Sequence, residues 1–217
     1  MRCPARKEKG EGVSARLVRQ GSPEWHCARL GKVTASRAWH VIAPGRGGGR
    51  SVGRARLARE LAMERITGLP GGEDENAFMA FGKANEPVAR RLYELETGCA
   101  VEEAGFFDHP HIPWCGASPD GLVGEDGLIE IKCPVKEKNW HSVEDVPPNY
   151  LAQINLQLAC TGRAWCDLVV LLPGDRIWVA RINRDQDAIA ALESAIIGFL
   201  PEVEAEVASI TTDLLEV

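Results

Sequence analysis

The sequence contains no run of about 18 apolar residues, the length that a helix needs to cross a bilayer, so we expect no transmembrane helix and no membrane partner. The first ten residues are basic, but no apolar stretch follows them, which argues against a secretory signal. Seven cysteines form no C-x-x-C pair, and their odd number favours reduced thiols over a disulfide framework or a zinc ribbon. Together these absences indicate a cytoplasmic protein.

Charge is distributed unevenly along the 217 residues, although the net charge is only −6. Residues 1–59 hold 14 Lys and Arg against 3 Asp and Glu, whereas the remaining residues hold 11 against 28. A basic segment of this kind fits contact with nucleic-acid phosphates, and an acidic segment fits metal ligands and a solvated tail. The alternative is that the arginine-rich segments are ordinary solvated surface.

One stretch, S-P-D-G-L-V-G-E-D-G-L-I-E-I-K-C at 118–133, combines two acids and a lysine. Its G-L-I-E-I-K segment has the pattern of a strand, in which alternate side chains share a face, so Glu130 and Lys132 lie on the same side. Asp120 lies at a turn that neighbouring glycines allow. A hairpin-like return therefore brings Asp120 beside Glu130.

Such a group of side chains is typical of a magnesium-dependent phosphodiesterase. Mg²⁺ prefers hard oxygen ligands and keeps several waters, which suits Asp120, Glu130 and the backbone carbonyl of Ile131. Lys132 is then placed to orient or deprotonate the attacking water and to oppose the charge that develops on the phosphate. The alternative is a surface β-hairpin with an ordinary Glu–Lys face.

The pattern of the remaining chain predicts an α/β protein with one domain over 13–217, after a disordered basic tail over 1–12. Helices are expected where apolar residues recur at helical spacing between capping residues. The expected helices cover 23–31, 34–42, 54–66, 83–97, 149–161 and 185 onward, the last kinked or broken near Pro201. The expected strands cover 99–107, 128–132, 165–172 and 176–182.

Glu86 is expected in the first turn of the helix over 83–97, directly before Pro87, which is tolerated at that position. It lies off the apolar stripe of Val88, Leu92 and Leu95, so it is free to point into a site. The alternative is a carboxylate that merely favours a helix start.

Two further pairs of polar residues occur at helical spacing or near helix ends. Gln153 and Gln157 share a helix face, and Gln153 is placed to hydrogen-bond the attacking water or Lys132. Arg29 ends one predicted helix and Ser36 falls in the first turn of the next, so they could flank a bound phosphate. Taken alone, Gln153 is equally compatible with a solvated polar face, whereas ordinary capping and a surface arginine are the preferred explanation for Ser36 and Arg29.

Five motifs in this order resemble the PD-(D/E)xK nuclease superfamily, and within it the lambda exonuclease / YqaJ viral recombinase family. They are W-H-C-A-R-L-G-K-V-T-A-S at 25–36, F-G-K-A-N-E-P-V-A-R at 81–90, C-G-A-S-P-D-G-L at 115–122, E-I-K-C-P at 130–134 and Y-L-A-Q-I-N-L-Q at 150–157. The resemblance implies a restriction-endonuclease-like core, in which a central mixed sheet is flanked by helices.

The resemblance also implies roles for individual residues. Metal ligation falls to Glu86, Asp120 and Glu130 with the Ile131 carbonyl, whereas Lys132 and Gln153 match the positions that serve the nucleophilic water. Arg29 and Ser36 match the pair that holds the 5′-terminal phosphate in lambda exonuclease. Asn155 departs from the family pattern, in which a second glutamine is frequent. Asp108, His109 and His111 are assigned no role.

The activity implied by this resemblance is a Mg²⁺-dependent 5′→3′ exonuclease on double-stranded DNA, with two metal ions and with Mn²⁺ as a substitute. Such an enzyme releases 5′-mononucleotides and leaves a 3′ single strand for phage-type recombination. The family further implies a ring-shaped homotrimer, DNA ends as substrate and a single-strand annealing recombinase as partner.

Two other functional classes remain open at this stage. The first is another nuclease of the superfamily, either an endonuclease or an iron–sulfur exonuclease. Cys99, Cys115, Cys133, Cys160 and Cys166 lack the tight spacing of an iron–sulfur cluster, which argues against the latter. The second is a non-catalytic DNA-end-binding module, against which the presence of every matched catalytic residue argues.

Overall fold

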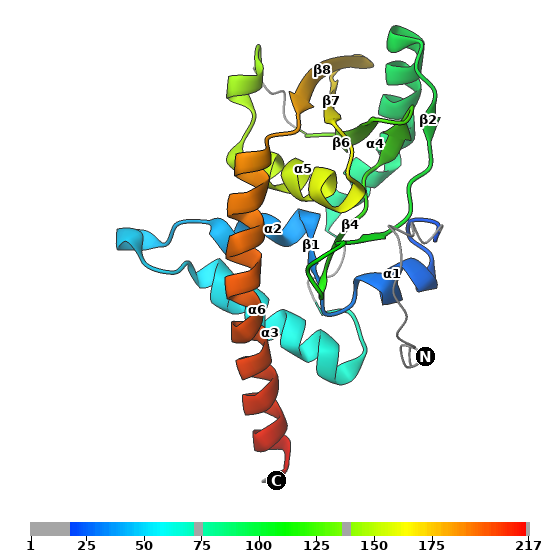
Figure 1. Cartoon of the computed structure of the whole chain (residues 1–217). Coiled ribbons are helices and arrows are strands. Elements are labelled where there is room, and N and C mark those ends of the chain that lie inside the picture. Colours follow the sequence, from blue (N-terminus) through cyan, green and yellow to red (C-terminus); the bar gives the residue numbers. More distant parts are fainter. Residues whose placement is uncertain (1–17, 72–75, 136–139, 216–217) are drawn as a thin grey trace.

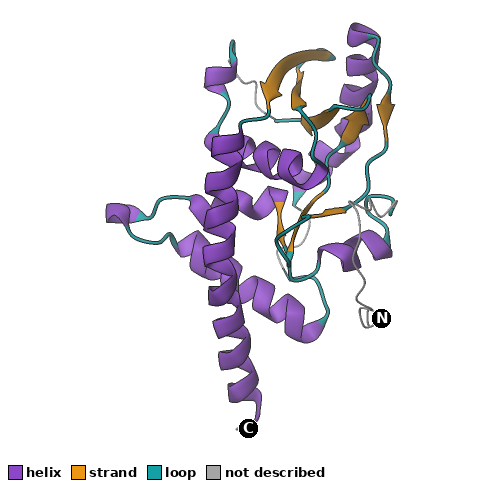
Figure 2. Cartoon of the chain, viewed as in Figure 1, coloured by secondary structure: helices purple, strands orange, loops and turns teal. Residues whose placement is uncertain are grey.

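The protein is described by a computed structural model over residues 18–71, 76–135 and 140–215, so the expected tail over 1–12 lies outside the described residues. The described chain is a mixed α/β fold in which the strands are surrounded by helices (Figures 1 and 2). This arrangement confirms the predicted fold class of a mixed sheet flanked by helices.

The central sheet has five strands in the order β2-β5-β6-β7-β8. Strands β6 and β7 run parallel, and the other neighbours are antiparallel. A second sheet has the order β1-β4-β3, with β1 parallel and β3 antiparallel to β4. The strands are β1 (Val33–Thr34), β2 (Val101–Glu102), β3 (Phe107–Asp108), β4 (Cys115–Ala117), β5 (Gly121–Val123), β6 (Gly127–Lys132), β7 (Trp165–Leu172) and β8 (Arg176–Asn183).

The α-helices mostly start and stop at residues with recognisable capping chemistry. Ser22 and Ser51 accept backbone hydrogen bonds at the starts of α1 and α3, and Gly68, Gly98 and Gly162 end α3, α4 and α5 in the left-handed conformation. The α-helices are α1 (Pro23–Arg29), α2 (Ala38–Ile42), α3 (Val52–Thr67), α4 (Ala77–Thr97), α5 (Pro148–Thr161) and α6 (Gln186–Leu215), and 3₁₀ turns cover Ala35–Arg37, Arg46–Gly48 and Val143–Asp145.

The two faces of the central sheet belong to different apolar clusters, which fixes where each side chain of β6 points. On one face Leu128 packs in a core that also contains residues of α2, α3, α5 and α6. On the other face Ile129 and Ile131 pack with Ala89 and Tyr93 of α4. Because strand side chains alternate, Glu130 lies on the face opposite Ile129 and Ile131, as the sequence pattern predicted. Its hydrogen bonds with Gln153 and Gln157 place it against α5.

Helix α4 begins earlier than the sequence suggested. Asn76 caps it by accepting hydrogen bonds from the backbone N–H groups of Phe78 and Met79, both at 3.0 Å. Glu86 therefore lies in the middle of the helix and not in its first turn, and Pro87 lies inside it. The apolar contacts of Ala89 and Tyr93 with the sheet compensate for the backbone hydrogen bond that proline cannot donate.

The predicted apolar stripe of α4 is also shifted. Ala89 and Tyr93 are the buried residues of this helix, whereas Val88 and Leu95 are exposed and only Leu92 packs against the core. The strand expected over 99–107 is likewise two short strands, β2 and β3, which belong to different sheets.

The terminal helix α6 is not broken at Pro201, contrary to one of the two expectations for that position. It continues from Gln186 to Leu215 and extends beyond the rest of the fold (Figure 1). Phe199 and Val203, on either side of the proline, are fully buried. Their packing favours continuation of the helix despite the missing backbone donor.

None of the helices in the described ranges combines the length and the apolar character that a bilayer crossing demands. Cys99, Cys115, Cys133, Cys160 and Cys166 are free thiols, as expected. Cys27 differs because it is disulfide-bonded, so the expectation of reduced thiols does not hold for that residue.

Candidate active site

The hairpin formed by β5 and β6 brings Asp120 to Glu130, as predicted. Gly121 pairs with Ile129 in this hairpin, and the Asp120 backbone N–H donates to the Ile129 carbonyl at 3.1 Å. The Asp120 carboxylate accepts a hydrogen bond of 2.6 Å from the Ile131 backbone N–H. Asp120 is therefore locked onto the strand that carries Glu130 and Lys132.

The Glu130 carboxylate is buried and engaged at both oxygens. Lys132 Nζ and Gln153 Nε2 each lie 2.6 Å from Oε1, and Gln157 Nε2 lies 2.6 Å from Oε2. Lys132 Nζ also donates to Gln153 Oε1 at 3.0 Å and lies 4.8 Å from the ring centroid of Tyr150. Strand β6 and helix α5 thus form one continuous polar network within an apolar core.

Glu86 reaches the same region from α4 through Arg90. Arg90 Nη2 lies 3.2 Å from Glu86 Oε1 and donates to the backbone carbonyl of Asp120 at 2.5 Å. Arg90 Nη1 is buried and has no hydrogen-bond partner in the described part of the chain. A single guanidinium therefore connects the helix that carries Glu86 to the turn that carries Asp120.

The pKa values of Asp120 and Lys132 are shifted because the carboxylates of the cluster lie close together and have little contact with solvent. Burial raises the pKa of Asp120 well above its usual value, and the negative charges of Glu130 and Glu86 raise it further. Burial alone would lower the pKa of Lys132, but the Glu130 carboxylate, its hydrogen bond and Asp120 outweigh that effect and raise it. The lysine therefore carries its proton at neutral pH.

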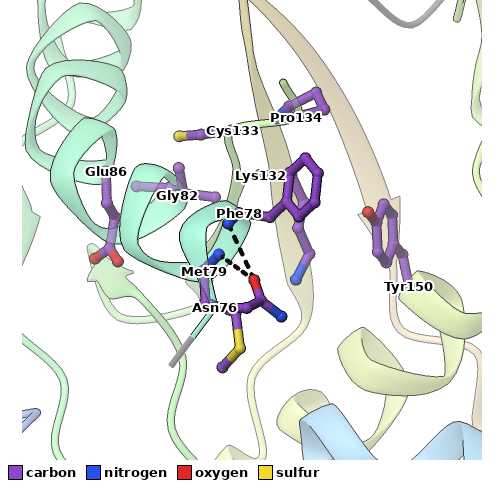
Figure 3. Close-up of a pocket in the computed structure, with 10 residues that line it drawn as sticks. Asn76, Phe78, Met79, Gly82, Glu86, Lys132, Cys133, Pro134 and Tyr150 are labelled. Carbon is purple, nitrogen blue, oxygen red and sulfur yellow. Dashed lines mark hydrogen bonds between the residues drawn. The ribbon is translucent and has the colours of Figure 1, made fainter. Parts of the chain in front are cut away.

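A pocket of about 410 Å³ opens beside this cluster. Glu86 lies on one side of the pocket, and Lys132 and Tyr150 lie on the other (Figure 3). Its lining also includes Ile131, Cys133 and Pro134 from the end of β6, and Asn76, Phe78, Met79 and Gly82 from the start of α4. Of the catalytic candidates, Glu86, Ile131 and Lys132 therefore line this space, whereas Asp120, Glu130 and Gln153 lie behind its lining.

The donor set fits a hard divalent cation. Asp120, Glu130, Glu86 and the Ile131 carbonyl supply only oxygen atoms. The raised pKa of Asp120 reflects burial first and then the negative charges of Glu130 and Glu86, which a cation would compensate. Within 18–71, 76–135 and 140–215, however, no three His, Cys, Asp or Glu side chains already surround one point as metal ligands. Each carboxylate is held instead by a donor from the protein.

A second pocket, of about 190 Å³, contains Arg29. The Arg29 guanidinium lies 4.1 Å from the Trp25 ring centroid and forms no hydrogen bond or ion pair with the described residues. Burial and the nearby Arg37 charge lower the pKa of Arg29, while Glu64 opposes this effect. The Arg29 guanidinium group is largely removed from solvent, is repelled by the charge of Arg37 and has no ion-pair partner among the described residues. Such a group is a favourable partner for an anion.

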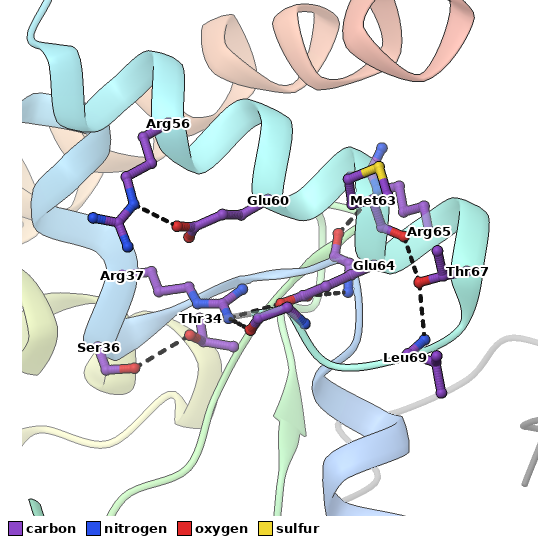
Figure 4. Close-up of polar contacts among 12 residues, drawn as sticks. Thr34, Ser36, Arg37, Arg56, Glu60, Met63, Glu64, Arg65, Thr67 and Leu69 are labelled. Carbon is purple, nitrogen blue, oxygen red and sulfur yellow. Dashed lines mark hydrogen bonds and ion pairs between the residues drawn. The ribbon is translucent and has the colours of Figure 1, made fainter. Parts of the chain in front are cut away.

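Ser36, the other predicted phosphate ligand, lies beside this pocket but does not line it. Its hydroxyl is 3.3 Å from that of Thr34, which does line the pocket (Figure 4). The structure thus brings Arg29 and Thr34 to one cavity and leaves Ser36 exposed at its side.

The acids and histidines that received no role have structural partners. Asp108 forms an ion pair with Lys32, and His109 lies 3.0 Å from Glu193 of α6. The His109 ring also accepts backbone hydrogen bonds from His111 and Ile112. These contacts connect β3 and the loop after it to β1 and α6.

Three residues of these sites were not identified from the sequence: Gln157, Arg90 and Arg37. Gln157 was placed on the same helix face as Gln153, but its burial against Glu130 could not be read from spacing alone. Arg90 occurs four residues after Glu86, which is the spacing of a helical ion pair and was an available signal. Arg37 follows Ser36 directly and carried no separate signal.

Comparisons with known proteins agree with this geometry. A family model described as the YqaJ-like viral recombinase domain matches residues 24–164. One similar solved structure is the alkaline exonuclease LHK-Exo from Laribacter hongkongensis in complex with dAMP. Its sequence is 43% identical to this chain, and the two structures superpose with a TM-score of 0.77. The match covers 90% of this chain and 99% of LHK-Exo. A second LHK-Exo structure is 42% identical with a TM-score of 0.76 over the same shares.

A more distant structure shares only the fold. It is a phage-related exonuclease from Haemophilus somnus 129PT, whose sequence is 15% identical to this chain and whose TM-score is 0.67. The match covers 82% of this chain and 96% of the exonuclease. A comparison with curated proteins found no significant match.

Proposed function

The chain belongs to the YqaJ-like viral recombinase domain family, and on that premise we propose that it is a Mg²⁺-dependent exonuclease that degrades double-stranded DNA from its 5′ ends. The observation that carries the proposal is the convergence of Asp120, Glu130, Lys132 and Gln153 in one polar network, next to a pocket that Lys132 and Glu86 line. The 43% identity to LHK-Exo, an alkaline exonuclease, supports the same conclusion.

The residues that would hold Mg²⁺ are Asp120 and Glu130 with the Ile131 carbonyl, and Glu86 would serve mainly a second ion. When bound, Mg²⁺ lowers the pKa of a coordinated water and polarises the phosphoryl oxygen. Mn²⁺ is an expected substitute because it accepts the same oxygen ligands.

Lys132 and Gln153 act on the water and on the phosphate. The Lys132 ammonium group lines the pocket, 2.6 Å from Glu130 Oε1, and would oppose the charge that develops on the phosphoryl oxygens. Gln153 bridges Lys132 and Glu130, so its amide fixes the direction in which both side chains point. This arrangement suits Lys132 either to orient the attacking water or to deprotonate it.

The polarity of the enzyme rests on the second pocket. A terminal 5′-phosphate is the anion that the unpaired Arg29 would bind, with Ser36 at the side of the pocket. Cleavage one nucleotide from a held 5′ end releases a 5′-mononucleotide, and the dAMP bound by LHK-Exo supports a product of this class. The complementary 3′ strand is then left for a single-strand annealing recombinase, and we further propose a homotrimeric assembly.

The test uses a linear duplex labelled at one 5′ end, with Mg²⁺ or with EDTA, and a closed circular duplex as control. The expected result is mononucleotide release from the labelled 5′ end of the linear duplex, abolished by EDTA. Cutting of the circle would instead identify an endonuclease on the same fold. End binding without turnover in Mg²⁺ or Mn²⁺ would identify a binding module.

A further inference from the structure

The pocket of Arg29 contains a second guanidinium, that of Arg37, which neither family resemblance nor sequence spacing had assigned. Both arginines line the same cavity of about 190 Å³. They lie close enough for the charge of Arg37 to lower the pKa of Arg29, after the larger effect of burial. The Glu64 carboxylate also lines this cavity and offsets part of the repulsion between the two guanidinium groups, and a bound anion would offset more of it.

The orientation of Arg37 is set by Glu64 of α3. Glu64 is buried, and its Oε1 accepts a hydrogen bond of 2.7 Å from Arg37 Nη2 (Figure 4). The same carboxylate accepts from the backbone N–H groups of Gly31, at 2.8 Å, and Gly71, at 3.3 Å. Hydrogen bonds from two backbone N–H groups therefore fix the Glu64 carboxylate, which in turn holds Nη2 of the Arg37 guanidinium group.

The other N–H donors of the Arg37 guanidinium group remain available to a ligand. A guanidinium carries five N–H donors, and only Nη2 of Arg37 is engaged, by Glu64 and weakly by the Gly71 carbonyl at 3.5 Å. Its Nε and Nη1 make no hydrogen bond within the part of the chain that the structure describes. Arg37 can thus donate to a ligand in the pocket without leaving Glu64.

We propose that Arg37 is a second ligand of the terminal 5′-phosphate and that Glu64 is the residue that positions it. This inference rests on the proposed function of the pocket and deepens it. A terminal phosphate monoester carries more charge than an internal diester and has three acceptor oxygens, so two guanidinium groups can bind it from two sides. The pair would therefore determine specificity for phosphorylated over hydroxyl 5′ ends.

The experiment compares kcat/KM on two duplexes of identical sequence, one with a 5′-phosphate and one with a 5′-hydroxyl. Arg37→Gln is expected to lower the phosphate-to-hydroxyl ratio of kcat/KM by about tenfold or more, which corresponds to the loss of one charge-assisted hydrogen bond. Arg37→Lys should retain part of the preference for the phosphorylated end, because lysine keeps the positive charge but lacks the planar set of N–H donors of the guanidinium group.

Two more variants separate positioning from general effects. Glu64→Gln is expected to lower the ratio as well, because a neutral amide holds the guanidinium less firmly, whereas a purely structural Glu64 would change both duplexes equally. Arg56→Gln removes the same charge from an exposed residue that pairs with Glu60 and does not line the pocket, so it should leave the ratio unchanged. Thermal melts establish that each variant is folded.

The outcomes distinguish this inference from the function on which it rests. If Arg29→Gln abolishes the phosphate preference and folded Arg37→Gln keeps it, the role of Arg37 is refuted and the phosphate pocket stands. If the wild-type enzyme shows no preference at all, the phosphate pocket itself is refuted, and the role of Arg37 with it.

Discussion

Gln157 donates its side-chain amide to Oε2 of Glu130 at 2.6 Å, and both side chains are almost completely buried. The opposite oxygen of Glu130 is taken by Lys132 and Gln153. Because both carboxylate oxygens have protein donors, the orientation of Glu130 is fixed before any substrate arrives. Gln157 thus belongs to the proposed catalytic network although it does not line the pocket.

Replacing Gln157 with leucine should weaken both folding and catalysis. The substitution replaces the amide with an apolar side chain of similar size and leaves Glu130 Oε2 buried without a donor, which lowers the free energy of unfolding by about 1–3 kcal/mol. Turnover should fall as well, since the carboxylate can rotate. Denaturant unfolding and mononucleotide release measure the two effects.

The matched control is Asn155→Ala, on the same helix but half-buried and outside the hydrogen bonds of Glu130. It should change both quantities much less. Wild-type stability and turnover in Gln157→Leu would contradict the role assigned to Gln157.

Asp120→Asn should stabilise the metal-free protein while abolishing activity. Burial, Glu130 and Glu86 raise the pKa of Asp120 in the folded state, so its contribution to stability is present at low pH and is lost as the pH rises through that raised pKa. The neutral asparagine avoids this loss, and we expect a gain on the order of 1 kcal/mol above that pH. Unfolding midpoints in EDTA across a pH series provide the measurement.

The same variant reports on the metal without any assay of turnover. Mg²⁺ should raise the unfolding temperature of the wild type, because it binds the folded carboxylates, and should raise that of Asp120→Asn much less. Identical pH profiles and identical Mg²⁺ increments in the two proteins would place the metal elsewhere.

Arg90→Lys should weaken metal binding more than it weakens the chemical step. Lysine keeps the positive charge but cannot bridge Glu86 and the Asp120 carbonyl as the guanidinium does. Loss of a residue that orients metal ligands typically costs about tenfold or more in metal affinity. Calorimetric titration of Mg²⁺ into the DNA-free protein measures it directly.

The control for this change is Arg91→Lys at the adjacent, exposed position, which should bind Mg²⁺ like the wild type. An unchanged affinity in Arg90→Lys would mean that Arg90 only stabilises the fold.

The parts of the site that lie on one hairpin were predictable from the sequence. The strand pattern around Glu130 and the glycines after Asp120 were sufficient to place two carboxylates together, because a two-stranded return has few alternative geometries. Gln153 was placed on the correct side of its helix for a similar reason, since helical spacing fixes which residues share a face.

Other features depended on contacts between distant segments, and spacing could not reveal them. The start of α4 was misplaced because Gly82 and Pro87 lower local helix propensity, whereas the packing of Tyr93 against the sheet sustains the helix. The continuation of α6 through Pro201 similarly depends on burial of Phe199. The contact between Arg37 and Glu64 joins residues 27 positions apart and follows only from the fold.

The central claim, that this cluster is the catalytic site, is tested most directly by mononucleotide release from Lys132→Met, normalised to the amount of duplex that the variant binds. Methionine keeps the length and apolar stem of the side chain but removes the ammonium group that we propose to face the phosphate. We predict that release falls by about a hundredfold or more, while the amount of bound duplex stays close to that of the wild type. Release at the wild-type rate from a folded Lys132→Met protein would contradict the assignment.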